Sequence, residues 1–173
     1  MTTPHRPGKP IASLSLDADN LWSYQKTHGD AGWDRYGSYL DVLAPRVLDF
    51  LAARDLTITF FVVGKDASLP ENREALASLS AAGHEIGNHS FRHEPWLHLY
   101  ERDELVDELA RAEDAIAEAT GERTIGFRGP GYSLSTSTLE VLVERGYRYD
   151  ASTLPTVIGP LSRAYYFRAS KLT

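Results

Sequence analysis

Hydrophobic and polar positions follow two different periods along this chain. The continuous β-branched and aromatic run Leu56–Gly64 predicts a strand that is buried on both faces of a parallel sheet. Between Leu40 and Leu51 apolar residues recur three and four positions apart, which predicts an amphipathic helix. The same spacing returns at residues 72–82 and 103–120, and a glycine follows each range as a helix-ending residue. Strands therefore alternate with helices.

Shorter runs complete this alternation. Ser135 is placed to cap a further helix, which Gly146 ends. Four more short strands are predicted, at Ile11–Leu16, His84–Asn88, Ile125–Arg128 and Tyr147–Asp150. A succession of β-α units predicts an α/β fold with a parallel sheet, either open and doubly wound or rolled into a barrel.

The stretch Leu21–Tyr39 shows neither period. It is rich in aromatic residues and glycines, and we expect a long irregular loop there. Its rings would suit a wall against which a sugar stacks, although a loop folding onto its own side chains explains them nearly as well.

Composition excludes several classes of function. The 173 residues suffice for one domain with a real core, and the net charge of −6 comes without a basic stripe, so we expect no nucleic-acid partner. No cysteine is present, which excludes disulfides, thiolate metal sites and cysteine nucleophiles. No apolar run reaches membrane-spanning length and the N-terminal lead-in has no apolar signal region, so we expect a cytoplasmic protein.

Polar residues gather where the predicted strands end. Taken one at a time, the acidic ones read as surface turns and the histidines as unrelated. In a parallel sheet, however, all carboxyl ends of the strands lie on one edge, so residues there converge in space. This coincidence favours a functional site formed by Asp17, Asp19, His89, His93, Arg128 and Asp150.

Two of these residues have a spacing typical of metal ligands. His89 and His93 stand four positions apart, and we expect one helical turn that presents both imidazoles on the same side, where a divalent metal can bridge them. Because cysteine is absent, any metal must be held by nitrogen and oxygen atoms.

Four motifs, in their order along the chain, resemble those of a known family. They are Asp17-Ala18-Asp19, Asn88-His89-Ser90-Phe91-Arg92-His93, Arg128-Gly129-Pro130-Gly131-Tyr132 and Tyr149-Asp150-Ala151-Ser152. The set resembles the polysaccharide deacetylases with a NodB-type domain, carbohydrate esterase family 4, over about Ile11 to Ser152. The Asp-x-Asp form is similar to the intracellular peptidoglycan-deacetylase-like and allantoinase-like branch. The resemblance implies a NodB-type distorted (β/α) barrel of parallel strands, here incomplete, with residues 1–173 forming a single, C-terminally truncated catalytic domain.

The resemblance also implies roles for individual residues. Asp17 would be the general base, paired with Arg128. The divalent metal, Zn²⁺ as the first expectation, would be held by Asp19, His89 and His93. The backbone N–H of Gly131 would donate to a tetrahedral oxyanion, and Asp150 would belong to the fourth motif. Substrate contacts are expected from Trp22 and Tyr132.

The implied activity is metal-dependent removal of an N-acetyl or similar N-acyl group from an amino sugar, in a glycan or a lipid-linked sugar precursor. Two alternatives stay open: an allantoinase-like amide hydrolase acting on a small non-sugar substrate, and a non-catalytic glycan-binding domain. Some allantoinase-like relatives use no metal, which bears on the cofactor as well as on the substrate.

This sequence departs from the family pattern at its C-terminal end. The family's fifth motif supplies a histidine that the fourth-motif aspartate orients and that protonates the leaving amine. No histidine follows Asp150, and two strands of the family's barrel have no candidates. Either these residues are the front part of a longer protein, which we favour, or the barrel is open and the acid is lost. In both cases we expect this chain to lack its general acid. We also expect an exposed apolar sheet edge unless residues 153–173 or a second copy of the chain cover it.

Overall fold

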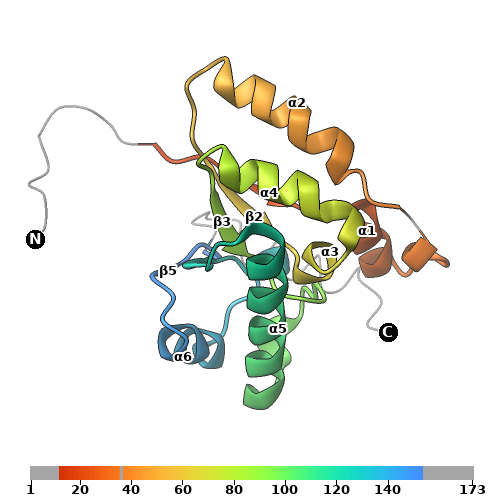
Figure 1. The fold of residues 1–173 in the computed structure, drawn as a ribbon. Coiled ribbons are helices and arrows are strands. Elements are labelled where there is room, and N and C mark those ends of the chain that lie inside the picture. The colour runs from red at the N-terminus through yellow and green to blue at the C-terminus, as the bar shows by residue number, and fades with distance from the viewer. Residues whose placement is uncertain (1–11, 36, 154–173) are drawn as a thin grey trace, which may run out of the picture.

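The computed structural model describes residues 12–35 and 37–153, which are built around one parallel sheet (Figure 1). Its strands lie in the order β1-β2-β3-β4-β5. They are β1 Ser15–Ala18, β2 Thr59–Val62, β3 Glu85–Asn88, β4 Gly126–Phe127 and β5 Tyr149–Asp150. Every neighbouring pair is parallel. Because the order never reverses, the sheet has no switch point of the doubly wound kind, and it winds in one direction as a barrel does.

Helices connect the strands and cover one face of the sheet (Figure 1). The α-helices are α1 Leu21–His28, α2 Leu40–Ala52, α3 Gly64–Ala67, α4 Arg73–Ala81, α5 Arg102–Thr120 and α6 Thr136–Glu144. Short 3₁₀ turns are η1 Trp33–Arg35, η2 Pro70–Asn72, η3 Leu97–Leu99 and η4 Pro130–Tyr132. Ser135 caps α6 as expected, because its side chain accepts a hydrogen bond from the backbone N–H of Thr138.

The core lies between the sheet and its helices. Strand residues Phe60, Val62 and Ile86 pack there against α2, α4 and the end of α5, and a second cluster joins α5 and α6 to Phe127. Side chains alternate along a strand, so the next residues point to the opposite face. Asp17 and Phe61 share a register row on that opposite face. One face of the sheet thus packs against the helices, and the other carries Asp17 beside the buried side chain of Phe61.

Two local predictions were wrong. The first strand begins at Ser15 instead of Ile11 and runs past Asp17 to Ala18. Much of Leu21–Tyr39 is helical and not irregular: α1 fills its first half and ends at Gly29, whose φ is 72°. Helix α1 buries Trp22 together with two polar residues, so no apolar stripe marks it in the sequence.

Within residues 12–35 and 37–153 no helix is long and apolar enough to span a membrane. The expectation that the C-terminal tail covers the sheet edge falls on residues beyond 153, outside the described part of the chain.

Candidate metal centre

Three predicted ligands meet at the carboxyl edge of the sheet. Asp19 directly follows β1, His89 directly follows β3, and His93 lies in the loop beyond. The Asp19 Oδ1 atom lies 3.3 Å from His93 Nε2 and 3.6 Å from His89 Nε2. One ligand atom from each residue fits within 4.8 Å of the others, and all three side chains are buried. The convergence predicted from the strand ends is therefore present in the fold.

The segment between the histidines is a loop and not the helical turn that their spacing suggested. Ser90 has φ 61° and His93 has φ 55°, so two non-glycine residues adopt left-handed backbone. Asn88 Oδ1 accepts a hydrogen bond of 2.8 Å from the Ser90 N–H, and Ser90 Oγ accepts one of 3.2 Å from the His93 N–H. These bonds stabilise a conformation that would be costly alone, and they turn both rings toward Asp19.

Glu108 supports the same loop from outside the motif. This carboxylate on α5 is fully buried and accepts hydrogen bonds from the backbone N–H groups of Phe91 and Arg92. A guanidinium nitrogen of Arg92 also donates to it at 2.8 Å. The sequence does contain a signal for this residue: Glu108 stands three residues after Leu105 and four before Ala112, inside the apolar stripe of its helix.

The surroundings of His89 fix its ring for metal binding. Its Nδ1 lies 2.5 Å from the backbone carbonyl of Arg128, and because a carbonyl can only accept, Nδ1 carries the proton. Nε2 is then the lone-pair nitrogen facing Asp19, the arrangement typical of a metal-ligating histidine. Burial lowers the pKa of His89, which keeps the ring neutral, the form that binds metals.

Asp19 and His93 contain buried polar atoms that lack partners. Burial alone would raise the pKa of Asp19, but the neighbouring rings of His93 and His89 lower it. Among the described residues, Asp19 Oδ1 and both ring nitrogens of His93 make no hydrogen bond. Such atoms are costly in a protein interior. A divalent cation would satisfy Asp19 Oδ1 and one His93 nitrogen, and this nitrogen-and-oxygen donor set suits zinc.

Asp17 lies beside this centre with Arg128. An Asp17 oxygen accepts from Arg128 Nη1 at 2.6 Å, and the other lies 3.9 Å from His89 Nε2. The guanidinium is itself held by Ser15 Oγ at 2.7 Å and by the Ala151 carbonyl at 3.2 Å. The Asp17 side chain is 28% exposed whereas that of Asp19 is 9% exposed. Asp17 is thus the carboxylate that a substrate can reach.

Asp150 lies at the end of β5, as predicted, and its hydrogen bonds among the described residues come from Ser152. Its two oxygens accept from Ser152 Oγ at 2.6 Å and from the Ser152 N–H at 3.1 Å. Ser152 Oγ in turn accepts a hydrogen bond of 2.8 Å from the Gly129 N–H. Asp150 therefore supports the loop that carries Gly131, and the expected lack of a histidine general acid beside it stays a prediction.

The remaining predicted residues line the surroundings of the centre. Gly131 lies in η4 with φ 59°, and the guanidinium of Arg128 lies 5.9 Å from the Tyr132 ring centre. Trp22 is 5% exposed, donates from Nε1 to Asp66 Oδ1 at 2.7 Å, and meets the His93 ring edge-on at 6.5 Å between centroids. Trp22 thus packs against the ring of His93. The substrate contacts of Trp22 and Tyr132 and the oxyanion role of Gly131 stay predictions.

Comparison with known proteins agrees with this geometry. A sequence model of the family described as polysaccharide deacetylase matches residues 30–149, more than half of the chain. The chain belongs to the polysaccharide deacetylase family. This confirms the resemblance drawn from the motifs and the barrel-type fold expected from it.

Relatives place the chain within the family. A peptidoglycan deacetylase from Helicobacter pylori is 30% identical over 128 residues, 74% of this chain and 41% of the relative. The peptidoglycan-N-acetylmuramic acid deacetylase PdaA from Bacillus subtilis is 32% identical over 111 residues, 64% of this chain and 41% of the relative. The chain thus spans about two fifths of the length of these curated relatives.

Among solved structures, one from Mycobacterium smegmatis is provisionally classed as a polysaccharide deacetylase. It superposes with a TM-score of 0.70 at 29% identity, over 86% of this chain and 55% of that one. The five-stranded sheet with its helices therefore corresponds to part of a larger barrel-type domain.

Proposed function

We propose that this chain is a metal-dependent hydrolase that removes the N-acetyl group from an amino sugar, with peptidoglycan as the first substrate class to test. The observation that carries the proposal is the centre of Asp19, His89 and His93, whose ligand atoms fit within 4.8 Å, with the solvent-accessible carboxylate of Asp17 beside it. The printed activities of the Helicobacter and Bacillus relatives support the choice of substrate class.

Each residue of the site would have a separate role in the reaction. A divalent metal held by Asp19, His89 and His93 would supply Lewis-acid polarisation of the amide carbonyl and activation of water. Asp17 lies close enough to that centre to accept the proton of the attacking water. Arg128 orients Asp17 and balances its charge, and its carbonyl keeps His89 in the ligating tautomer.

A second candidate is a glycan-binding domain that keeps the metal ligands without turnover. The observation in its favour is Asp150, whose carboxylate bonds to Ser152 and to no histidine among the described residues. Amide cleavage must protonate a poor leaving group, and a positioned acid contributes about 10²–10⁴-fold to the rate. Without that acid the chain would bind sugar and deacetylate slowly or not at all.

One experiment separates these functions. The purified protein is stripped with a chelator, reloaded with zinc, and assayed for acetate release from peptidoglycan and from chitooligosaccharides. Asp17→Asn should abolish release while zinc affinity stays within a few-fold, whereas Asp19→Ala should lose both. Zinc binding with no acetate release from any glycan would support the binding domain. Failure to bind any divalent metal would contradict both.

A further inference from the structure

The side chain of Lys65 is a cation that forms no salt bridge among the described residues. Lys65 lies in α3, directly after β2 at the carboxyl edge of the sheet. Its Nζ lies 4.3 Å from the ring centre of Trp22 and 4.6 Å from that of Trp33. Among the described residues it forms no salt bridge, and the three N–H donors of its ammonium group have no acceptor. The two indoles thus contact the ammonium group, and no acceptor in the described part of the chain takes its N–H donors.

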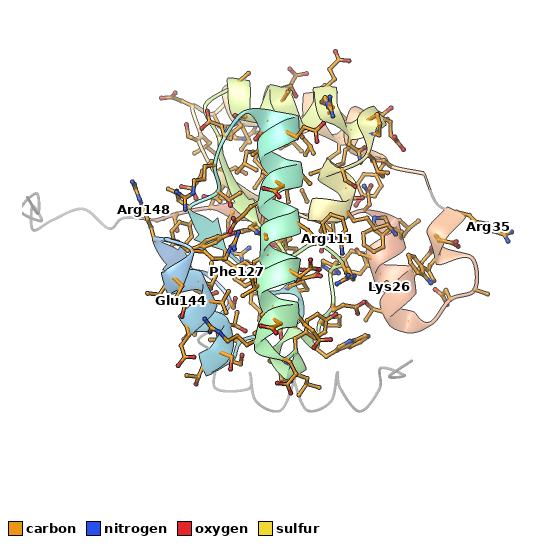
Figure 2. The ribbon with its side chains drawn as sticks, turned by 60° about the horizontal axis from the view of Figure 1, so that its bottom comes forward. Lys26, Arg35, Arg111, Phe127, Glu144 and Arg148 are labelled. Atoms are coloured by element: carbon orange, nitrogen blue, oxygen red, sulfur yellow. The ribbon has the colours of Figure 1, made fainter. Side chains whose placement is uncertain are left out.

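The neighbouring Lys26 differs from Lys65 because it forms an ion pair. Lys26 of α1 also approaches the Trp33 ring, at 5.5 Å. Unlike Lys65, it forms an ion pair with Glu94 and donates to the Arg92 carbonyl at 3.2 Å. Figure 2 shows Lys26 on the side of α5 that faces away from Glu144 and Arg148. Lys26 therefore has an internal structural partner, and Lys65 has none among the described residues.

The environment of Lys65 favours the arrival of an anion. Burial and the charge of Lys26 lower the pKa of Lys65, against the smaller opposing effects of Asp66 and Asp34. A partly desolvated cation without an anion is costly, and a bound carboxylate or phosphate would remove that cost.

Trp22 connects Lys65 to the candidate metal centre. The distance from Nζ to the Trp22 ring centre is 4.3 Å, and that from Trp22 to the His93 ring centre is 6.5 Å. The ammonium group therefore lies no more than about 11 Å from the ring of a metal ligand, because the direct path cannot exceed the path through Trp22. An anionic substituent on an amino sugar whose N-acetyl group lies at the centre must cover the distance to this ammonium group, and that distance is at most about 11 Å.

We propose that Lys65, held between Trp22 and Trp33, is the anion-binding subsite of this chain and selects amino sugars that carry a carboxylate or phosphate near the N-acetyl group. The proposal rests on the proposed function, since it assumes that the metal centre takes an amino sugar. Its closest alternative is a purely structural role, in which Lys65 only fastens α3 to Trp22 and Trp33.

The test compares three ligands that differ in one substituent. N-acetylglucosamine is neutral, N-acetylmuramic acid adds a carboxylate, and N-acetylglucosamine 1-phosphate adds a phosphate. Binding of each to the zinc-loaded protein is measured by calorimetry, with tryptophan fluorescence as a second readout because Lys65 contacts two indoles. We expect at least one anionic ligand to bind about tenfold or more tightly than the neutral one, the effect of one charged hydrogen bond. The ligand that binds more tightly shows whether the subsite prefers a carboxylate or a phosphate.

Three variants separate recognition from structure. Lys65→Gln should remove the preference for the anionic ligand and leave binding of the neutral sugar within a few-fold. Lys65→Arg should keep the preference, because the charge and the stacking remain. Lys26→Gln is the matched control, since it removes a nearby charge that already pairs with Glu94, and it should change the ratio between ligands much less than Lys65→Gln does.

The outcomes distinguish this proposal from the proposed function. A protein that shows no preference for either anion, or a Lys65→Gln variant that weakens all three ligands equally, overturns the subsite. An intact preference with no acetate release in the activity assay leaves the subsite standing and refutes only the hydrolase.

Discussion

Glu108 offers the sharpest test of what stabilises the loop between His89 and His93, because it lies in α5, outside the four sequence motifs. The change Glu108→Gln keeps the size of the side chain and removes its charge. One amide oxygen remains for the two backbone N–H groups of Phe91 and Arg92, and the amide nitrogen now faces the guanidinium of Arg92. The loop between His89 and His93 should therefore loosen.

The size of the effect follows from these bonds. A hydrogen bond to a charged group contributes about 1.5–3 kcal/mol, and one between neutral groups about 1 kcal/mol. Two buried backbone bonds lose charge assistance, while the contact to the Arg92 side chain, which is 43% exposed, is partly screened by solvent. We expect the free energy of unfolding of the metal-free protein to fall by about 2–4 kcal/mol. Zinc affinity should fall by about 10- to 100-fold, as for other residues that orient metal ligands.

The assays are urea unfolding of the chelator-treated protein and zinc competition against a chromophoric chelator. Glu118→Gln serves as the control, because Glu118 lies on the same helix but is 70% exposed in its pair with Arg73. The control should change neither quantity. If Glu108→Gln left stability within about 0.5 kcal/mol of the parent protein and bound zinc equally well, the support attributed to Glu108 would be wrong.

Three further predictions concern the frame around the site. In Gly64→Ala a new Cβ would lie 2.6 Å from the backbone of α5, so thermal unfolding should show a loss of about 1–3 kcal/mol, whereas Gly37→Ala, with no atom within 4 Å, should show little. Ser152→Ala removes the acceptor of the Gly129 N–H and should cost about 1–3 kcal/mol in urea unfolding. Burial and a bond to a carboxylate raise the pKa of Tyr149 to about 12, above its ordinary value of 10.0, so the stability it contributes is present below pH 10 and is lost as pH rises toward 12. Unfolding measured across that range should show this loss, and Tyr149→Phe should reduce it.

The sequence predicted the fold well where one period dominates a segment. The run Leu56–Gly64 and the leucine spacing of Leu40–Leu51 correspond to β2 and α2. Helix α1 was missed because it buries Ser23 and Thr27 beside Trp22, and polar residues on a buried face leave no apolar stripe. Contacts between the two ends of this segment fix its conformation instead. Asn20 forms hydrogen bonds with Ser38 and with the backbone of Tyr39, and the Tyr39 hydroxyl donates to the Asp19 carbonyl.

The location of the site was predictable for a topological reason. Parallel strands in sequential order place all their carboxyl ends together, so Asp17, Asp19, His89 and Arg128 had to converge once the strands were located. The local geometry was not predictable in the same way. A spacing of four residues suggested a helical turn, whereas side-chain bonds from Asn88, Ser90 and Glu108 create a loop with two left-handed residues. Such bonds depend on distant elements, and no local period encodes them.

Arg128, directly after the two-residue strand β4, contacts both His89 and Asp17. Its N–H donates to the Asn88 carbonyl at 3.0 Å and its own carbonyl accepts from His89, so its backbone belongs to the metal centre. Its guanidinium donates to Asp17, so its side chain positions the proposed base. The proposed ligand and the proposed base are therefore positioned by one residue, and a displacement of β4 would disturb both together. A side-chain substitution alone would leave the backbone bond to His89 in place and release only Asp17, because the two functions use different atoms of the same residue.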